Sequence, residues 1–212
     1  SLSKCAAAFL RGVRDRELGQ ISLNRPGRHL VYNSLAAVGV ALELDIDFAV
    51  IARALENFQG VQRRLQVKGE AGGVLVVDDY GHHPTEIRAT LEAIREGWPE
   101  RRVVTVFQPH RYSRTAGLFD TFLTAFRRSD LLVLCDIYAA GEEPREDVSS
   151  AILNEAIKQH GQRLAYHLPD LVQNPASLLP LLEPGDLVLT LGAGTIGRLG
   201  EDLLPLLANW EC

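Results

Sequence analysis

The chain has 212 residues, of which 46% are apolar and 23% are charged, and its net charge is −5 at pH 7. This composition is typical of a folded globular protein, so it excludes a disordered chain, a collagen-like repeat and a small disulfide scaffold. The acidic balance counts against nucleic acid and membranes as partners, and no apolar run approaches the roughly 20 residues of a membrane helix.

The first 60 residues predict a hairpin of two strands followed by two helices. The strands are expected at residues 9–15 and 17–24, and the helices at residues 30–44 and 47–58. The hairpin rests on alternating apolar residues, and the helices rest on apolar residues at helical spacing. Asp47 is typical of a helix N-cap. We place a domain boundary near Gly60.

After residue 60, short apolar runs alternate with helical patterns. Strands are expected at 65–67, 74–80, 103–107, 131–138, 164–168 and 186–194, and helices at 84–96, 115–128, 148–160, 170–182 and 195–207. Apolar strands alternating with helices predict a doubly wound α/β domain with a parallel sheet. Ligands of such sheets bind at the carboxyl ends of the strands, where the chain reads DDYGHHP, FQPHRYSR, DIYAAGE and GAGTIG.

The segment DDYGHHPTE, residues 78–86, places two carboxylates and two imidazoles at the end of one strand. Such side chains suit an active site, but they also suit a helix cap with solvated side chains. A metal site formed by His82, His83, Glu86 and His110 is a third interpretation. The spacing of these residues matches no zinc pattern, which disfavours that interpretation.

The segment FQPHRYSRT, residues 107–115, follows the next predicted strand and contains His110, Arg111 and Arg114. Arginine binds carboxylate or phosphate through two parallel hydrogen bonds, and a helix beginning near Thr115 adds positive potential. The alternative is that both arginines pair with surface carboxylates. Together with DDYGHHPTE, the segment predicts a site for an anionic group.

Three weaker signals remain. GAGTIG matches the GxGxxG pattern of dinucleotide sites. It lies in the last predicted βα unit, however, and no later strand supplies the acidic residue that would bind the ribose. A tight strand-to-helix turn is therefore favoured over NAD binding. The arginines of GVQRRLQ are either solvated or reach a phosphate held between domains. Asn33, on an apolar helix, indicates a cap or a hydrogen-bonded partner.

The motifs PGRH, NSLAAV, GVQRRLQ, VVDDYGHHPTE, VFQPHRYSRT and LGAGTIG occur here in the order found in the Mur ligases, which the chain resembles along essentially its whole length. The resemblance implies that residues 1–60 are the C-terminal portion of a central ATP-binding domain. Residues 61–212 would then form the Rossmann-like C-terminal domain. The chain has neither a methionine nor a P-loop of the form GxxxxGK[ST], so we expect it to be part of a longer protein with UDP-binding and P-loop segments elsewhere.

The resemblance also implies an activity, the ATP-dependent joining of L-alanine to UDP-N-acetylmuramate through an acyl phosphate. This reaction belongs to peptidoglycan precursor synthesis, and with it to cell-wall biogenesis, cell shape and cell division. The widely spaced cysteines, without a CxxC pair, fit the cytoplasm. The alternatives are a related ligase that adds a tripeptide to UDP-N-acetylmuramate and a free-standing binding module without catalysis. The fragment alone is expected to be inactive.

Site residues follow from the same motifs. The resemblance gives catalytic roles to Arg64, Asp79, His82 and His110, substrate contacts to Tyr80, His82, His110, Arg111 and Arg114, and nucleotide contacts to His29, Asn33, Arg64 and Asp79. ATP and Mg²⁺ are the implied cofactors, with the metal ligands mainly outside this chain. The chain departs from the family at Leu30, where asparagine is common, which shifts the expected adenine contact to His29 and Asn33.

Overall fold

The computed structural model describes residues 7–11, 17–24, 27–58 and 60–210. Two compact units divide the chain. One comprises Ser1–Val61 with Glu92–Pro99, and the other comprises Gln62–Leu91 with Glu100–Cys212. Among the described residues, no helix has both the length and the apolar character needed to cross a bilayer.

The first unit contains the predicted hairpin and the two predicted helices. Its elements are β1 (Ala7–Arg11), β2 (Glu17–Ser22), α1 (Arg28–Glu43) and α2 (Phe48–Asn57), and β1 pairs antiparallel with β2. The carboxylate of Asp47 accepts a hydrogen bond from the Ala49 amide at 2.8 Å, which confirms it as the N-cap of α2. Ile21, Val38 and Ile51 form the buried core. Residues 12–15 of the first predicted strand lie outside the described residues.

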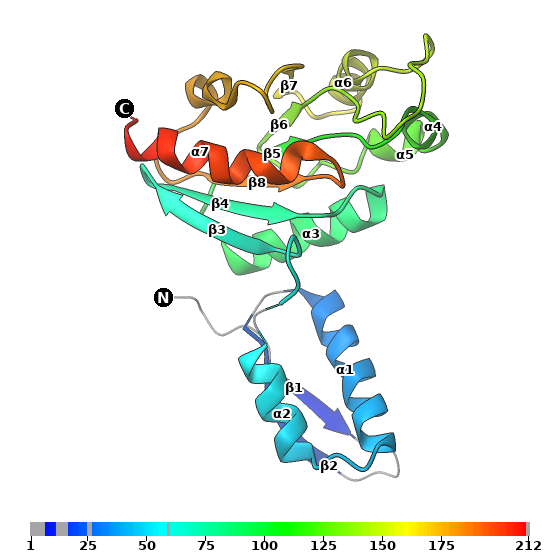
Figure 1. The fold of residues 1–212 in the computed structure, drawn as a ribbon, viewed down its shortest axis with the longest axis vertical. Helices are drawn as coiled ribbons and strands as arrows, with labels where there is room; N and C mark the ends of the chain where they lie inside the picture. The colour runs from blue at the N-terminus through cyan, green and yellow to red at the C-terminus, as the bar shows by residue number, and fades with distance from the viewer. Residues whose placement is uncertain (1–6, 12–16, 25–26, 59, 211–212) are drawn as a thin grey trace. The chain divides into compact units, whose positions relative to one another are not determined.

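The second unit is built on a six-stranded sheet with the order β3-β4-β8-β5-β6-β7 (Figure 1). The strands are β3 (Gln66–Ala71), β4 (Val74–Asp79), β5 (Val103–Phe107), β6 (Leu131–Leu134), β7 (Ala165–His167) and β8 (Leu187–Leu191). Every pairing is parallel except the one between β3 and β4, so the predicted doubly wound, mostly parallel sheet is confirmed.

The antiparallel edge strand β3 is longer than the short strand predicted at residues 65–67. Gly72 and Gly73 connect it to β4 with φ angles of +56° and +75°. A two-residue turn with positive φ at both positions is the favoured connection of a hairpin, and glycine adopts it without steric cost. The dipeptide Gly72-Gly73 was therefore the signal for an antiparallel hairpin at this edge.

The connecting helices are α3 (Pro84–Gly97), α4 (Tyr112–Gly117), α5 (Phe119–Phe122), α6 (Ser150–Gln159), η1 (Pro175–Leu181), η2 (Thr195–Arg198) and α7 (Leu199–Ala208), where η marks a 3₁₀ helix. Three predicted helices are shorter or more broken than expected. The one at 115–128 is two short helices, because Gly117, a poor helix former, ends the first. The one at 170–182 is the 3₁₀ helix η1, whose Pro180 lacks an amide hydrogen. The one at 195–207 begins as η2 before α7.

The sheet is covered on both faces, as its uniformly buried strands require. On one face, alternate residues such as Val76, Val106 and Val188 pack with Leu203 of α7 and Leu178 of η1. On the other face, Phe107 contacts Phe122 and Phe126, with ring centroids 5.5 and 5.2 Å apart. Figure 1 shows α7 and α3 on opposite sides of the sheet. The loops that carry the polar residues follow the carboxyl ends of the parallel strands, at one edge of the sheet.

Candidate functional site

The loops after β5 and β6 are joined at this edge of the sheet. His110 forms an isolated parallel bridge with Tyr138. The Tyr138 amide donates to the Pro109 carbonyl at 2.8 Å, and the Arg111 amide donates to the Tyr138 carbonyl, also at 2.8 Å. The bridge continues the β5–β6 pairing past the end of both strands. It therefore holds FQPHRYSR and DIYAAGE side by side.

A row of four aromatic rings runs from the end of β4 to the loop after β6. Tyr80 and His82 meet edge to face with their ring centroids 5.6 Å apart. His82 and His110 are 6.0 Å apart, and His110 and Tyr138 are 5.4 Å apart. The structure thus brings together Tyr80, His82 and His110 as the sequence predicted. Tyr138 is a fourth member that the sequence interpretation missed, although DIYAAGE was recognised as a loop at this edge.

Cationic side chains flank this row. Nη1 of Arg114 lies 3.2 Å from Nδ1 of His110, one helical turn apart. The guanidinium carbon of Arg64 lies 5.6 Å from the centroid of the Tyr80 ring, within the range of a cation–π contact. Arg64 and Arg111 are exposed and Arg114 is half-buried. None of these three arginines forms an ion pair with a carboxylate in the described part of the chain. At longer range, the charge of Arg64 acts on Asp79 and Glu86, and that of Arg111 acts on Glu142.

The imidazole of His110 is held in its neutral form. Burial lowers its pKa below the ordinary value of 6.5, and the positive charges of Arg114, His82 and Arg111 lower it further. Glu142 opposes this shift only weakly. Arginine can only donate, so the lone pair of the neutral ring at Nδ1 accepts from Arg114, and the ring carries its hydrogen on Nε2, where it can donate.

Glu142 fastens the loop after β6 to α4. Its carboxylate accepts hydrogen bonds from the Ser113 amide at 2.9 Å and from Ser113 Oγ at 2.5 Å. These bonds lower the pKa of Glu142 below its ordinary value, with a further contribution from the charge of Arg111. Glu142 therefore stays ionised and holds Ser113, which lies between Arg111 and Arg114 in the chain.

Glu86 caps the first turn of α3. Its Oε2 accepts from the amides of His82 at 3.0 Å and His83 at 3.2 Å. Burial acts to raise the pKa of Glu86, but these two hydrogen bonds and the nearby charges of His82 and Arg64 together outweigh it, and the pKa lies below the ordinary value. The helix-cap interpretation of DDYGHHPTE thus holds for Glu86. Across the described residues, no three His, Cys, Asp or Glu side chains come together in a way that could hold a metal ion.

Asp79 is buried, and its carboxylate is used by its own chain. Oδ2 accepts from the Leu65 amide at 2.9 Å, and Oδ1 accepts from the Gly81 amide at 2.7 Å and from Thr90 Oγ1 at 3.3 Å. Burial raises its pKa, and these hydrogen bonds together with the charge of Arg64 partly offset that effect. Asp79 therefore fixes the backbone around Arg64 and Tyr80, and the predicted contact with a nucleotide stays a prediction.

His29 and Asn33 lie on α1 in the first unit, whereas the ring row belongs to the second unit. Asn33 is exposed, and the side chain of His29 lies outside the described part. Leu30, where the family commonly has asparagine, packs against the core of Ile21 and Val38. The nucleotide contacts predicted for His29 and Asn33 stay predictions.

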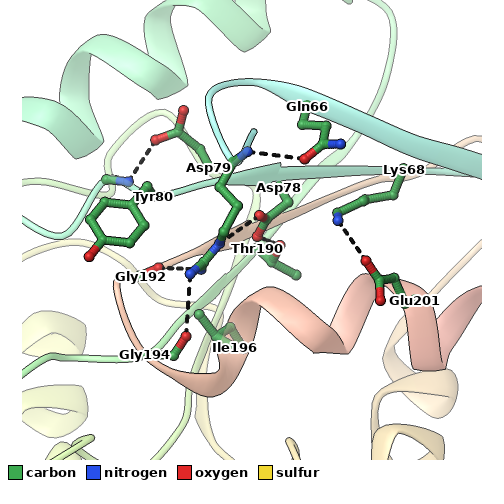
Figure 2. A network of polar contacts seen from close by, with 12 residues as sticks. Gln66, Lys68, Asp78, Asp79, Tyr80, Thr190, Gly192, Gly194, Ile196 and Glu201 are labelled. Atoms are coloured by element: carbon green, nitrogen blue, oxygen red, sulfur yellow. Dashed lines mark hydrogen bonds and ion pairs between the residues drawn. The ribbon is translucent and has the colours of Figure 1, made fainter. Parts of the chain in front are cut away.

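The glycines of GAGTIG make room for side chains of this protein. A Cβ at Gly192 would lie 2.7 Å from the Gln108 carbonyl oxygen, and one at Gly194 would lie 2.5 Å from Gln108 Oε1. Oε1 of Gln108 also accepts from the Ile196 amide at 3.0 Å. The motif is the predicted tight turn, and it packs on Gln108, which the sequence interpretation passed over. Figure 2 shows this turn beside the end of β4.

Comparison with known proteins gives one family. The family model described as "Mur ligase, glutamate ligase domain" matches residues 63–194. The UDP-N-acetylmuramate–L-alanine ligase of Desulfotalea psychrophila is 56% identical over 192 residues, which are 91% of this chain and 42% of that protein. The enzyme of the same name from Geobacter sulfurreducens is 52% identical over 200 residues, covering 94% of this chain and 43% of that protein. This chain thus spans about two fifths of the length of these curated relatives.

Solved structures agree on the fold. The crystal structure of the UDP-N-acetylmuramate–alanine ligase from Thermotoga maritima superposes with a TM-score of 0.73 and 27% identity, covering 89% of this chain and 40% of that one. A murein peptide ligase from Psychrobacter arcticus superposes with a TM-score of 0.65 at 22% identity, covering 95% and 42%. The second likeness concerns the fold alone.

Proposed function

The chain belongs to the Mur ligase family, and we propose that it is the C-terminal part of an ATP-dependent ligase that joins L-alanine to UDP-N-acetylmuramate. In this proposal residues 1–60 complete the central ATP-binding domain, and residues 61–212 form the C-terminal domain. The reaction belongs to peptidoglycan precursor synthesis. The observation that supports it is the row of rings with arginines beside it that form no ion pair, a site suited to a small amino acid bound by its carboxylate.

The proposed reaction proceeds through an acyl phosphate. ATP supplies the phosphoryl group that activates the muramic acid carboxylate, and the amine of L-alanine then displaces phosphate to form the amide. The protein must therefore neutralise charge on the phosphoryl group and hold the amine near the acyl carbon. In this chain the first demand falls on Arg64, with His29 and Asn33 on the nucleotide side.

The second demand falls on the residues after β4 and β5. Arg111 and Arg114 carry guanidinium groups that bind a carboxylate through paired hydrogen bonds. Neutral His110 accepts from Arg114 through Nδ1 and presents its Nε2–H as a donor to the bound amino acid, and the ring of His82 lies 6.0 Å away. Tyr80 closes the row on the side of Arg64. Binding the carboxylate at the arginines orients the amine away from them, toward the activated carbon.

ADP release by the full-length protein tests the proposal. We expect turnover when UDP-N-acetylmuramate, MgATP and L-alanine are all present, and a steep loss when L-alanine is replaced by D-alanine or by a tripeptide. Glycine and L-serine complete the panel, because they keep the carboxylate and amine and change only the side chain. Turnover with a tripeptide but not with L-alanine would reject the alanine assignment, and no turnover with any amine would reject the ligase assignment.

A further inference from the structure

The linker segment, residues 62–66, follows directly after the division between the two units. Arg63 and Leu65 have φ angles of +56° and +46°, a left-handed conformation that residues other than glycine keep only when their surroundings hold them in it. The carbonyl of Arg63 accepts from the Tyr80 amide at 2.6 Å. The amide of Leu65 donates to Asp79 at 2.9 Å. The backbone on both sides of Arg64 is therefore tied to the end of β4.

The side chain of Arg63 anchors this segment to two strands. Its Nε donates to Asp78 Oδ2 at 3.0 Å, and its Nη2 donates to the Gly192 carbonyl at 2.6 Å. Asp78 is fully buried and also accepts from Thr190 Oγ1 at 2.6 Å. Figure 2 shows this network and labels Asp78, Thr190 and Gly192, three of its members. A variant without the guanidinium leaves a buried carboxylate without its ion-pair partner, which is unfavourable.

The glycine turn after β8 is shaped around the same guanidinium. A Cβ at Gly197 would lie 2.5 Å from Cζ and Nε of Arg63, so alanine does not fit there without displacing the arginine. The carbonyl of Gly194 lies 3.5 Å from Nη1. The glycines that resemble a dinucleotide motif thus accommodate an arginine of the linker segment as well as Gln108.

Arg63 and Arg64 both contact the ring of Tyr80. Their guanidinium carbons lie 5.0 and 5.6 Å from its centroid. The position of Arg64 is thus fixed by the backbone hydrogen bonds of its neighbours Arg63 and Leu65, and by the ring of Tyr80. We propose that Arg63 is a positioning residue, which locks the linker segment onto the glycine turn and thereby fixes Arg64 and Tyr80 at the site.

A matched variant separates positioning from stability. Arg102 donates from Nε and Nη2 to Asp186 at 2.8 Å each, and Asp186 is 1% exposed. This second ion pair with a buried aspartate precedes β5 and β8, so it lies at the opposite edge of the sheet from Arg63. Both Arg63→Ala and Arg102→Ala leave a buried carboxylate unpaired, but only the first touches the linker segment.

Limited trypsin cleavage of the Arg64–Leu65 bond in the full-length protein, followed by mass spectrometry, measures how firmly the segment is held. We expect Arg63→Ala to speed this cleavage by about tenfold or more relative to Arg102→Ala, at temperatures equally far below each variant's melting point, because local opening is favoured. Arg63→Lys should be intermediate, since an ammonium cannot reproduce the planar fork. Equal cleavage rates in Arg63→Ala and Arg102→Ala would overturn the proposal.

A double variant covers the case in which Arg63→Ala does not fold. Arg63→Gln with Asp78→Asn removes both charges, so no buried carboxylate is left unpaired. Its melting temperature should lie closer to that of the wild type, while cleavage at Arg64–Leu65 stays accelerated by about tenfold. An unchanged cleavage rate in this variant would also overturn the proposal.

Turnover adds a readout that rests on the proposed function. The kcat/KM for L-alanine should fall at least about tenfold in the double variant and stay within about twofold of the wild type in Arg102→Ala. Equal values in the wild type and the double variant would contradict a positioning role. If the wild type itself fails to use L-alanine, the proposed function is rejected, and the cleavage comparison still tests Arg63.

Discussion

Replacing Arg114 by alanine tests the proposed amino-acid site most directly. The guanidinium is half-buried, lies 3.2 Å from His110, and forms no ion pair with a carboxylate of the described residues. A hydrogen bond to a charged group contributes about 1.5–3 kcal/mol, and about 1.4 kcal/mol corresponds to a factor of ten in binding. We therefore expect Arg114→Ala to raise the KM for L-alanine in the full-length enzyme by about 10- to 100-fold.

Two further variants define what this result means. Arg114→Lys should recover only part of the loss, because an ammonium cannot bind a carboxylate bidentately. Arg145→Ala is the matched control, since Arg145 pairs with Asp147 on the exposed surface of the same unit and should leave the KM unchanged. Melting temperatures should differ little among the three. An unchanged KM in both Arg114 variants would place this arginine outside the amino-acid site.

The same substitution should alter the titration of His110. The charge of Arg114 is, after burial, the largest cause that lowers the pKa of His110. In Arg114→Ala the imidazole should therefore titrate at a higher pH, which NMR of the ring protons can follow. A histidine whose folded-state pKa lies below 6.5 makes the protein less stable as the pH falls through 6.5. That acid-side loss of stability should shrink in the variant, and an unchanged titration would refute the electrostatic argument.

Four more predictions concern Arg64, Asp79, Glu86 and the chain as a whole. Arg64→Ala should lower kcat at least about tenfold with little change in melting temperature, because Arg64 is exposed. Asp79→Asn should lower kcat as well and should also reduce the free energy of unfolding by about 1–3 kcal/mol in denaturant titrations, because one carboxylate oxygen is replaced by an NH₂ group that faces a backbone amide. Glu86→Gln should be less stable than the wild type above pH 4.5, and the difference should vanish as the pH falls through the lowered pKa of Glu86, as thermal melts over pH 2–7 can show. The 212-residue chain alone should release no ADP and bind MgATP only weakly in calorimetry, because its sequence contains no P-loop to hold the phosphates; micromolar binding or turnover would contradict this.

The strands of the parallel sheet could be predicted because each one is a short apolar run between helical patterns. VLVVDD and VVTVF are buried along their whole length, and no tertiary contact is needed to recognise such a pattern. Phe122 and Phe126, within the helix expected at 115–128, have helical spacing. Both phenylalanines do pack on Phe107, but they do so from a short helix and the turns that follow it. Spacing thus predicted which residues are buried better than it predicted the helix.

The grouping of side chains at this edge could be predicted where one loop carries its own polar residues, and it could not be predicted where contacts join distant residues. His82, His110 and Arg114 belong to short motifs at strand ends, and parallel strands bring those ends together. The partners of Arg63 are different, because Asp78 and Gly192 lie 15 and 129 residues further along the chain. Nothing in the dipeptide Arg63-Arg64 distinguishes the arginine that is held in the fold from the one that is exposed.

Tyr80 is where the two halves of the proposed site meet. Its ring contacts two cationic groups, because the guanidinium carbons of Arg63 and Arg64 lie 5.0 and 5.6 Å from the ring centroid. Its other neighbour is the His82 ring, 5.6 Å away, which begins the row that leads to His110. Because its amide also donates to the Arg63 carbonyl, Tyr80 cannot shift without disturbing the linker segment. Arg64, which is proposed to act on phosphate, and the residues proposed to act on the amino acid are therefore positioned by one continuous set of contacts. That continuity is a physical reason for a single domain to carry both groups.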